Sequence, residues 1–139
     1  MNLGEEENPI LEFQVMDFKM ENGEIISLDI PKTVYPPRED SALLIDVLTN
    51  LKADGVAMEI GCGSGIISII MAKNNWIVEA CDINPYAIAA AKENSVKASV
   101  DEKINFKEGG LGDENFSIPR NTKLIFWNLP YLSPPSPDH

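Results

Sequence analysis

The chain has 139 residues, of which 44% are apolar and 24% charged, so it is long enough for one domain with a real core. A net charge of −11 argues against a non-specific grip on nucleic-acid phosphates. The acidic start of the chain argues against a signal peptide, and no apolar run reaches membrane-spanning length. Two cysteines, Cys62 and Cys81, and a lone terminal His139 predict no metal site. We expect both cysteines to be free, partly buried thiols, which indicates a reducing, cytoplasmic location.

The first regular element is expected to be a β-hairpin. Residues 12–18 alternate between polar and apolar, residues 21–24 supply a turn, and residues 24–30 return as the partner strand. We therefore expect residues 1–32 to form a tail and a hairpin flap beside the main domain. The hairpin could serve as a lid or only as a packing element.

The next segment is expected to lead into a helix over residues 41–51. Pro36 and Pro37 end any regular element, and Asp40 or Ser41 can cap the helix that follows. Helical spacing places four apolar side chains on one face, namely Leu44, Val47, Leu48 and Leu51.

Residues 59–65 read Glu-Ile-Gly-Cys-Gly-Ser-Gly between two apolar runs, which predicts strand, glycine-rich loop and helix. Alternate glycines let the backbone turn sharply and let a ligand approach closely. The spacing G-x-G-x-G differs from the dinucleotide fingerprint G-x-G-x-x-G. The carboxylate of Glu59 suits a ligand with an ammonium group better than one with a pyrophosphate.

A second predicted strand, residues 76–81, ends in Asp82, about 20 residues past the glycines, where an acid can hydrogen-bond ribose hydroxyls. The simpler interpretations are that the glycines form a turn and that Asp82 caps a helix. Asn84 fits the cap better, because Pro85 then takes the first helical position.

The remaining pattern predicts a helix over residues 85–94, a strand over 103–107, a loop over 108–121 and a strand over 123–127. The last strand is apolar enough to be buried on both faces. Alternating strands and helices from residue 56 onward predict an α/β fold with a parallel sheet, which we assign to a domain of residues 33–139.

Four motifs together resemble those of class I S-adenosylmethionine-dependent methyltransferases of the HemK/PrmC type. They are residues 59–65, Asp82 with Asn84-Pro85, Asn128-Leu129-Pro130-Tyr131, and residues 34–41. The last segment, Val-Tyr-Pro-Pro-Arg-Glu-Asp-Ser, is similar to the archaeal and eukaryotic branch that modifies glutamine in class I translation release factors. The resemblance covers residues 33 to 132.

The resemblance implies a Rossmann-like sheet with helices on both faces and seven strands. About three C-terminal strands are then missing, and strand 123–127 becomes an apolar edge. Either the chain is a fragment, or a partner covers that edge.

The resemblance also implies roles for individual residues. Glu59 would meet the methionine ammonium of the cofactor, Gly61 and Gly63 would give it room, and Asp82 would hold the ribose. The other implied cofactor-binding residues are Tyr35, Glu39, Asp40, Ser41, Ile83 and Asn128. The implied catalytic residues are Asn128, Leu129, Pro130 and Tyr131.

The chemistry of an amide fits the catalytic roles that the resemblance implies. A glutamine NH₂ is a poor nucleophile because its lone pair is delocalised into the carbonyl group. The Asn128 side-chain oxygen and the Leu129 carbonyl would accept its two hydrogens, while Tyr131 packs on the substrate plane, so that transfer needs mainly alignment and exclusion of water.

Two positions depart from the family pattern. Leu129 stands where the family has the first of two prolines, and Gly110-Leu111 stands where it has an acid before leucine. Glu108 or Asp113 could supply the missing acid.

The sequence leaves several functions open. The first is a glutamine N5-methyltransferase acting on a release factor, with a small zinc-binding activator subunit implied by the resemblance. Alternatives are a methyltransferase for adenine, guanine or lysine, an inactive cofactor-binding subunit of a complex, and, more distantly, a dinucleotide oxidoreductase.

Overall fold

The computed structural model describes residues 13–20, 22–34, 36–37 and 39–127, with the backbone alone for residues 39–43. Four parallel strands form its main sheet in the order β5-β4-β3-β6. Their bounds are β3 Val56–Ile60, β4 Ile77–Asp82, β5 Ile104–Glu108 and β6 Thr122–Trp127. This arrangement confirms the predicted α/β fold with a parallel sheet.

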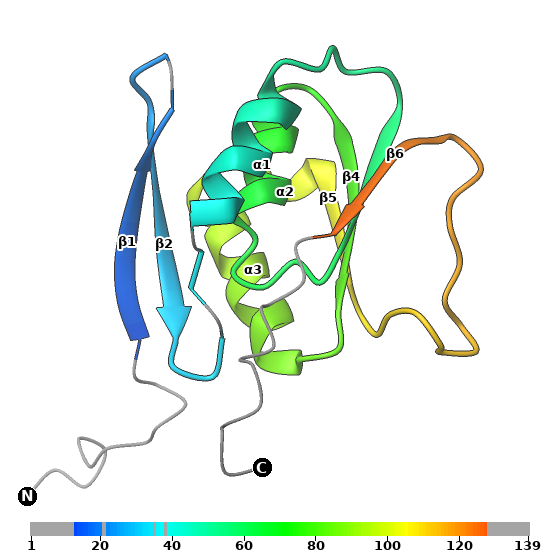
Figure 1. The fold of residues 1–139 in the computed structure, drawn as a ribbon. Coiled ribbons are helices and arrows are strands. Elements are labelled where there is room, and N and C mark those ends of the chain that lie inside the picture. The colour runs from blue at the N-terminus through cyan, green and yellow to red at the C-terminus, as the bar shows by residue number, and fades with distance from the viewer. Residues whose placement is uncertain (1–12, 21, 35, 38, 128–139) are drawn as a thin grey trace, which may run out of the picture.

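Within the described residues, three α-helices lie between the sheet and the N-terminal hairpin (Figure 1). They are α1 Glu39–Thr49, α2 Ile66–Lys73 and α3 Pro85–Lys97, and a short 3₁₀ turn covers Asp101–Lys103. Every residue of α2 from Ile66 to Ala72 is buried, because the sheet and its neighbouring helices surround it. Within the described residues, no helix combines the length and apolar character needed to cross a membrane.

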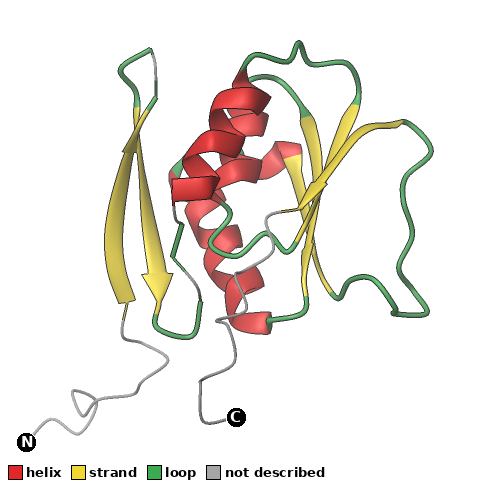
Figure 2. Ribbon diagram, viewed as in Figure 1, coloured by secondary structure: helices red, strands yellow, loops and turns green. Residues whose placement is uncertain are grey.

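The hairpin pairs β1 (Phe13–Lys19) with β2 (Ile25–Pro31) in an antiparallel sheet of its own, as predicted. Figure 2 shows it as a third layer beyond the helices. Ile26, Leu28 and Ile30 of β2 are buried and belong to the same hydrophobic cluster as α2 and α3. The inner face of the hairpin is therefore part of the central core.

Helix α1 differs from its prediction in position and in its buried face. It begins at Glu39 and ends at Thr49, so Asp40 and Ser41 lie in its first turn, and the prediction that one of them caps it is wrong. Leu48 is buried and Leu44 and Ile45 pack beside it, whereas Val47 and Leu51 are exposed. The contact of α1 with α2 selects this face.

Strand β6 is the edge of the parallel sheet, but it is not buried on both faces as predicted. Phe126 is buried against the core, while Ile125 is 40% and Trp127 54% exposed. Side chains alternate across a strand, and in the described part of the chain the helices lie beyond the other face of the sheet (Figure 1). Apolar character alone could not show which face is covered.

Candidate functional site

The candidate site is built at the carboxyl ends of the adjacent strands β3 and β4. Ile60 pairs with Cys81 in the parallel register, so the chain leaves both strands at the same edge of the sheet. The main-chain N–H groups of Gly61 and Cys62 both donate to the carbonyl oxygen of Cys81, at 2.8 and 3.0 Å. The glycine-rich loop is thereby fastened to the end of β4.

Asp82 connects the loop to the following helix. Its Oδ2 accepts a hydrogen bond of 2.8 Å from the N–H of Gly63, and its Oδ1 accepts one of 2.9 Å from the N–H of Asn84. An ionised carboxylate has about four acceptor positions, so capacity remains for ligand hydroxyl groups. The structure thus brings Asp82 together with the predicted loop.

The three glycines of the loop have different surroundings. All have positive φ, at 78° for Gly61, 56° for Gly63 and 92° for Gly65. A Cβ added at Gly61 or Gly63 would meet no atom within 4 Å, whereas one at Gly65 would lie 2.9 Å from the Cβ of Ala91. Gly65 serves the packing of α3, while open space beside Gly61 and Gly63 fits a ligand approaching the backbone.

Glu59 is 1% exposed, and its Oε1 accepts a hydrogen bond of 2.6 Å from the Ser68 hydroxyl of α2. Burial raises the pKa of Glu59 to about 8, the nearby charge of Asp82 adds to this, and the bonds from Ser68 oppose it. The carboxyl group is therefore mainly neutral at pH 7. A ligand ammonium close to it would favour the ionised form, so the predicted ammonium contact stays a prediction.

Asn84 is the N-cap of α3, as predicted. Its Oδ1 accepts from the N–H of Tyr86 at 2.9 Å, and Pro85 follows at the first helical position. Its Nδ2 also donates to the carbonyl of Thr33 at 2.8 Å. The chain after β2, which leads toward residues 34–41, is thus held beside Asp82.

The turn after β5 completes this edge of the sheet. Gly109 N–H donates to the carbonyl of Asp82 at 2.8 Å, and the Oδ2 of Asp113 accepts from Gly110 N–H at 2.8 Å. Ile83 is exposed, and a Cβ added at Gly110 would lie 3.5 Å from its Cγ2. Of the two substitute acids, Asp113 folds back onto this turn and Glu108 ends β5 exposed to solvent.

Cys62 lies in the loop and Cys81 in the adjacent strand β4, and both are buried free thiols, as the sequence predicted. Burial raises the pKa of Cys62 well above its usual value, and burial raises that of Cys81 as well. Neither thiol is therefore activated as a thiolate nucleophile.

Some predicted residues are not placed by the structure. Tyr35 and the whole segment Asn128, Leu129, Pro130 and Tyr131 lie outside the described residues. Glu39, Asp40 and Ser41 belong to the first turn of α1, for which only the backbone is described. Their proposed roles remain predictions.

Two polar residues of the site were not predicted from the sequence. Ser68 holds Glu59, and Asn94 donates to the carbonyl of Ser64 in the loop at 2.9 Å. The only signal for Ser68 was a hydroxyl inside an isoleucine-rich helix. Asn94 carried no comparable signal, because asparagine near the end of a helix is common.

Comparisons with known proteins agree with this geometry. Residues 38–131 match the model of the methyltransferase small domain family. A release factor glutamine methyltransferase of Dictyoglomus turgidum is 36% identical over 113 residues, which cover 78% of this chain and 40% of that protein. A Methanocaldococcus jannaschii protein, provisionally named a protein N5-glutamine methyltransferase, is 40% identical over 108 residues, or 77% of this chain and 52% of that protein.

Solved structures share the fold. A precorrin-6y C5,15-methyltransferase of Geobacter metallireducens is 20% identical with a TM-score of 0.58, covering 72% of this chain and 52% of that one. An RNA methyltransferase of Salinibacter ruber, solved with S-adenosyl-L-homocysteine, is 20% identical with a TM-score of 0.55, covering 68% and 61%. The fold is that of S-adenosylmethionine-dependent methyltransferases.

The chain spans about half the length, or less, of the two curated relatives described above. The family match extends over most of the present chain and includes the whole loop and Asp82. The chain therefore belongs to the methyltransferase small domain family.

Proposed function

We propose that the protein uses S-adenosylmethionine to methylate the side-chain amide nitrogen of a glutamine in a class I translation release factor. The observation that carries the cofactor assignment is the shared edge of β3 and β4. There, Gly61 and Gly63 leave open space, Glu59 is held by Ser68, and Asp82 keeps spare acceptor capacity. These acceptor groups and the open space beside them fit an amino-acid tail and a ribose.

Each of these groups has a proposed role in cofactor binding. Glu59 would face the ammonium group, the glycines would admit the cofactor to the backbone, and Asp82 would accept from the ribose hydroxyls. Tyr35, Glu39, Asp40, Ser41 and Ile83 would close around the cofactor. When bound, S-adenosylmethionine supplies a methyl group on a positively charged sulfur.

The acceptor side of the reaction is assigned to residues 128–131. The side-chain oxygen of Asn128 and the carbonyl of Leu129 would accept hydrogen bonds from the glutamine NH₂ group, with Pro130 shaping the loop and Tyr131 packing on the amide plane. Alignment of the nitrogen with the methyl group and exclusion of water would then supply most of the catalysis.

Two features support glutamine as the acceptor. Residues 34–41 are similar to the segment of the release-factor branch, and relatives from Dictyoglomus turgidum and Streptococcus pneumoniae are named release factor glutamine methyltransferases. By the same resemblance we propose a small zinc-binding activator subunit as a partner.

A second candidate is methylation of a nucleobase. Relatives include a ribosomal RNA small subunit methyltransferase C and a tRNA (guanine(37)-N(1))-methyltransferase, at 29% and 34% identity. The net charge of −11 weighs against it, because nucleic-acid binding usually relies on basic patches.

Calorimetry tests the cofactor first. The full chain should bind S-adenosylhomocysteine and should not bind NAD; the reverse result would overturn the proposal. The proposed acceptor is the glutamine of a Gly-Gly-Gln loop in the release factor. Transfer of labelled methyl should then be measured, with and without a zinc-binding activator, to a release factor in which this loop is intact or changed to Gly-Gly-Ala. RNA serves as the competing acceptor.

The catalytic assignment is tested by Asn128→Ala, with Asn121→Ala as its control, since Asn121 lies just before β6 and contributes a main-chain carbonyl to Val56. Asn128→Ala should abolish transfer even when S-adenosylmethionine is saturating, and Asn121→Ala should retain transfer. Cofactor binding without transfer to any acceptor would indicate an inactive subunit.

A further inference from the structure

Asn94 is a fully buried polar residue in the middle of the interface between α3 and its neighbours, with 0% of its surface exposed. Its Oδ1 accepts from the N–H of Asp29 at 2.8 Å, and its Nδ2 donates to the carbonyls of Asp29 at 3.1 Å and of Ser64 at 2.9 Å. Three bonds satisfy both ends of the side-chain amide, so its burial is accompanied by full pairing.

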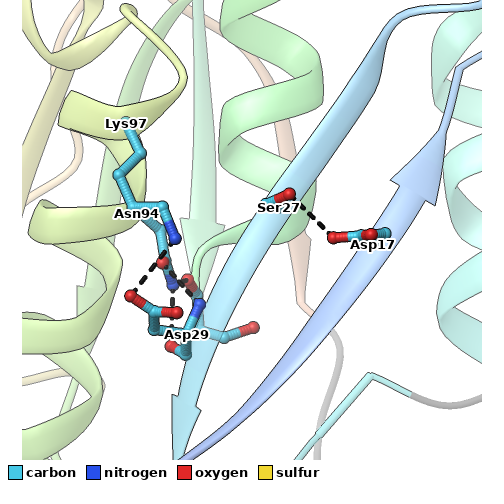
Figure 3. A network of polar contacts seen from close by, with 6 residues as sticks. Asp17, Ser27, Asp29, Asn94 and Lys97 are labelled. Carbon is cyan, nitrogen blue, oxygen red and sulfur yellow. Dashed lines mark hydrogen bonds and ion pairs between the residues drawn. The ribbon is translucent and has the colours of Figure 1, made fainter.

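On the hairpin side, Asn94 occupies the free edge of β2. Both main-chain groups of Asp29 are directed to it, on the side away from the pairing with Val15 of β1. Figure 3 shows Asn94 and Lys97 of α3 directed toward Asp29, while Ser27 reaches Asp17 across the hairpin. The side chain thus replaces one residue of a neighbouring strand and anchors the hairpin edge.

On the site side, Asn94 holds the glycine-rich loop near its C-terminal end, just before α2. Ser64 is buried and stands between Gly63 and Gly65, both in the left-handed region. Its carbonyl would lose a buried partner if Asn94 were removed. Reorienting that peptide group would also move the N–H of Gly65, which belongs to the same planar unit and donates to the carbonyl of Cys62. The orientation of the loop therefore depends on a side chain that reaches it from α3.

We propose that Asn94 is a positioning residue for the cofactor, which fixes the Ser64 carbonyl and couples the N-terminal hairpin to the glycine-rich loop. This inference rests on the proposed function. In this proposal the hairpin stabilises the position of the glycine-rich loop through Asn94. Two ion pairs, Lys97 with Asp29 at 3.2 Å and Lys73 with Glu24, hold the same hairpin from the helices.

The first test compares Asn94→Leu with Ser95→Ala. Ser95 is the neighbouring buried residue of α3, and its hydroxyl donates to the carbonyl of Lys92 within the same helix, so its loss perturbs α3 without touching the loop. Asn94→Leu should weaken binding of S-adenosylhomocysteine about tenfold, whereas Ser95→Ala should stay within about twofold. Equal affinities in the two variants would overturn the inference.

The second test uses the unmodified chain, so it does not depend on folding of a variant. Coupling between sites is reciprocal, so binding of S-adenosylhomocysteine should slow hydrogen exchange at the Asp29 amide, while the amide of Ile25 at the far end of β2 serves as reference. Protection of Gly61 and Gly63 without protection of Asp29 would refute the coupling alone. Absence of any binding would refute the proposed function and this inference with it.

Discussion

The N–H of Gly63 donates a hydrogen bond of 2.8 Å to the Oδ2 of Asp82, which joins the loop after β3 to the end of β4. The two residues are 19 positions apart in the chain. One carboxylate therefore shapes the loop and, in the proposed function, also receives the ribose.

Asp82→Asn should raise the dissociation constant for S-adenosylhomocysteine by a factor of about ten or more. The carboxylate now accepts hydrogen bonds from two main-chain N–H groups, and in the variant the amide NH₂ would face one of these donors. Calorimetry measures the change. Glu79→Gln is the matched control, since Glu79 accepts from Asn105 on the next strand, and it should bind as the parent does. An unchanged affinity in Asp82→Asn would remove this residue from the site.

Replacing two glycines of the loop by alanine, one at a time, should distinguish a glycine needed for packing from a glycine needed for cofactor binding. Gly65→Ala should lower the free energy of unfolding by about 2–4 kcal/mol, because its methyl would collide with Ala91 and its φ is positive. Gly63→Ala should cost only about 1 kcal/mol, since nothing lies near the added methyl, yet it should weaken cofactor binding. Urea unfolding and calorimetry check both; if Gly63→Ala retained full affinity, the open space beside it would not be a ligand site.

The buried carboxyl of Glu59 predicts a pH dependence of stability. Its pKa is raised from 4.5 to about 8, so between these values the folded protein holds a proton that the unfolded chain has lost. The contribution of Glu59 to the free energy of unfolding is therefore highest below pH 4.5. It falls as pH rises toward 8, by up to about 1.4 kcal/mol per pH unit.

Glu59→Gln should remove that fall and should be more stable than the parent at pH 9. Urea unfolding at four pH values between 5 and 9 measures the slope. Glu102→Gln, at an exposed position, should keep the parental slope. Equal slopes in the parent and in Glu59→Gln would show that the buried carboxyl does not titrate as described.

Asn84 is expected to serve two separable purposes. Asn84→Ala should destabilise the protein by about 1 kcal/mol through loss of the helix cap. Asn84→Ser should retain the cap but is too short to donate to the Thr33 carbonyl, so hydrogen exchange near residue 34 should rise while the melting temperature changes little. If both variants behaved alike, the bond to Thr33 would contribute nothing beyond the cap.

Local patterns in the sequence predicted much of the fold. The order of strands and helices, the cap at Asn84 and the loop at residues 59–65 each depend on residues a few positions apart, and the structure places all three as expected. The same reasoning misplaced the start of α1, because a capping residue signals a helix end only to within a turn.

Only the tertiary structure decided which surfaces and polar groups meet. The packing of the layers left one face of β6 exposed at Ile125 and Trp127, and burial raised the pKa of Glu59. The packing also brought Asn94 into contact with Ser64 and with Asp29, which is 65 positions from Asn94 in the chain. The sequence determines local conformation through steric and hydrogen-bonding preferences of neighbouring residues. Burial and long-range hydrogen bonds depend on how the layers pack, which no short pattern encodes.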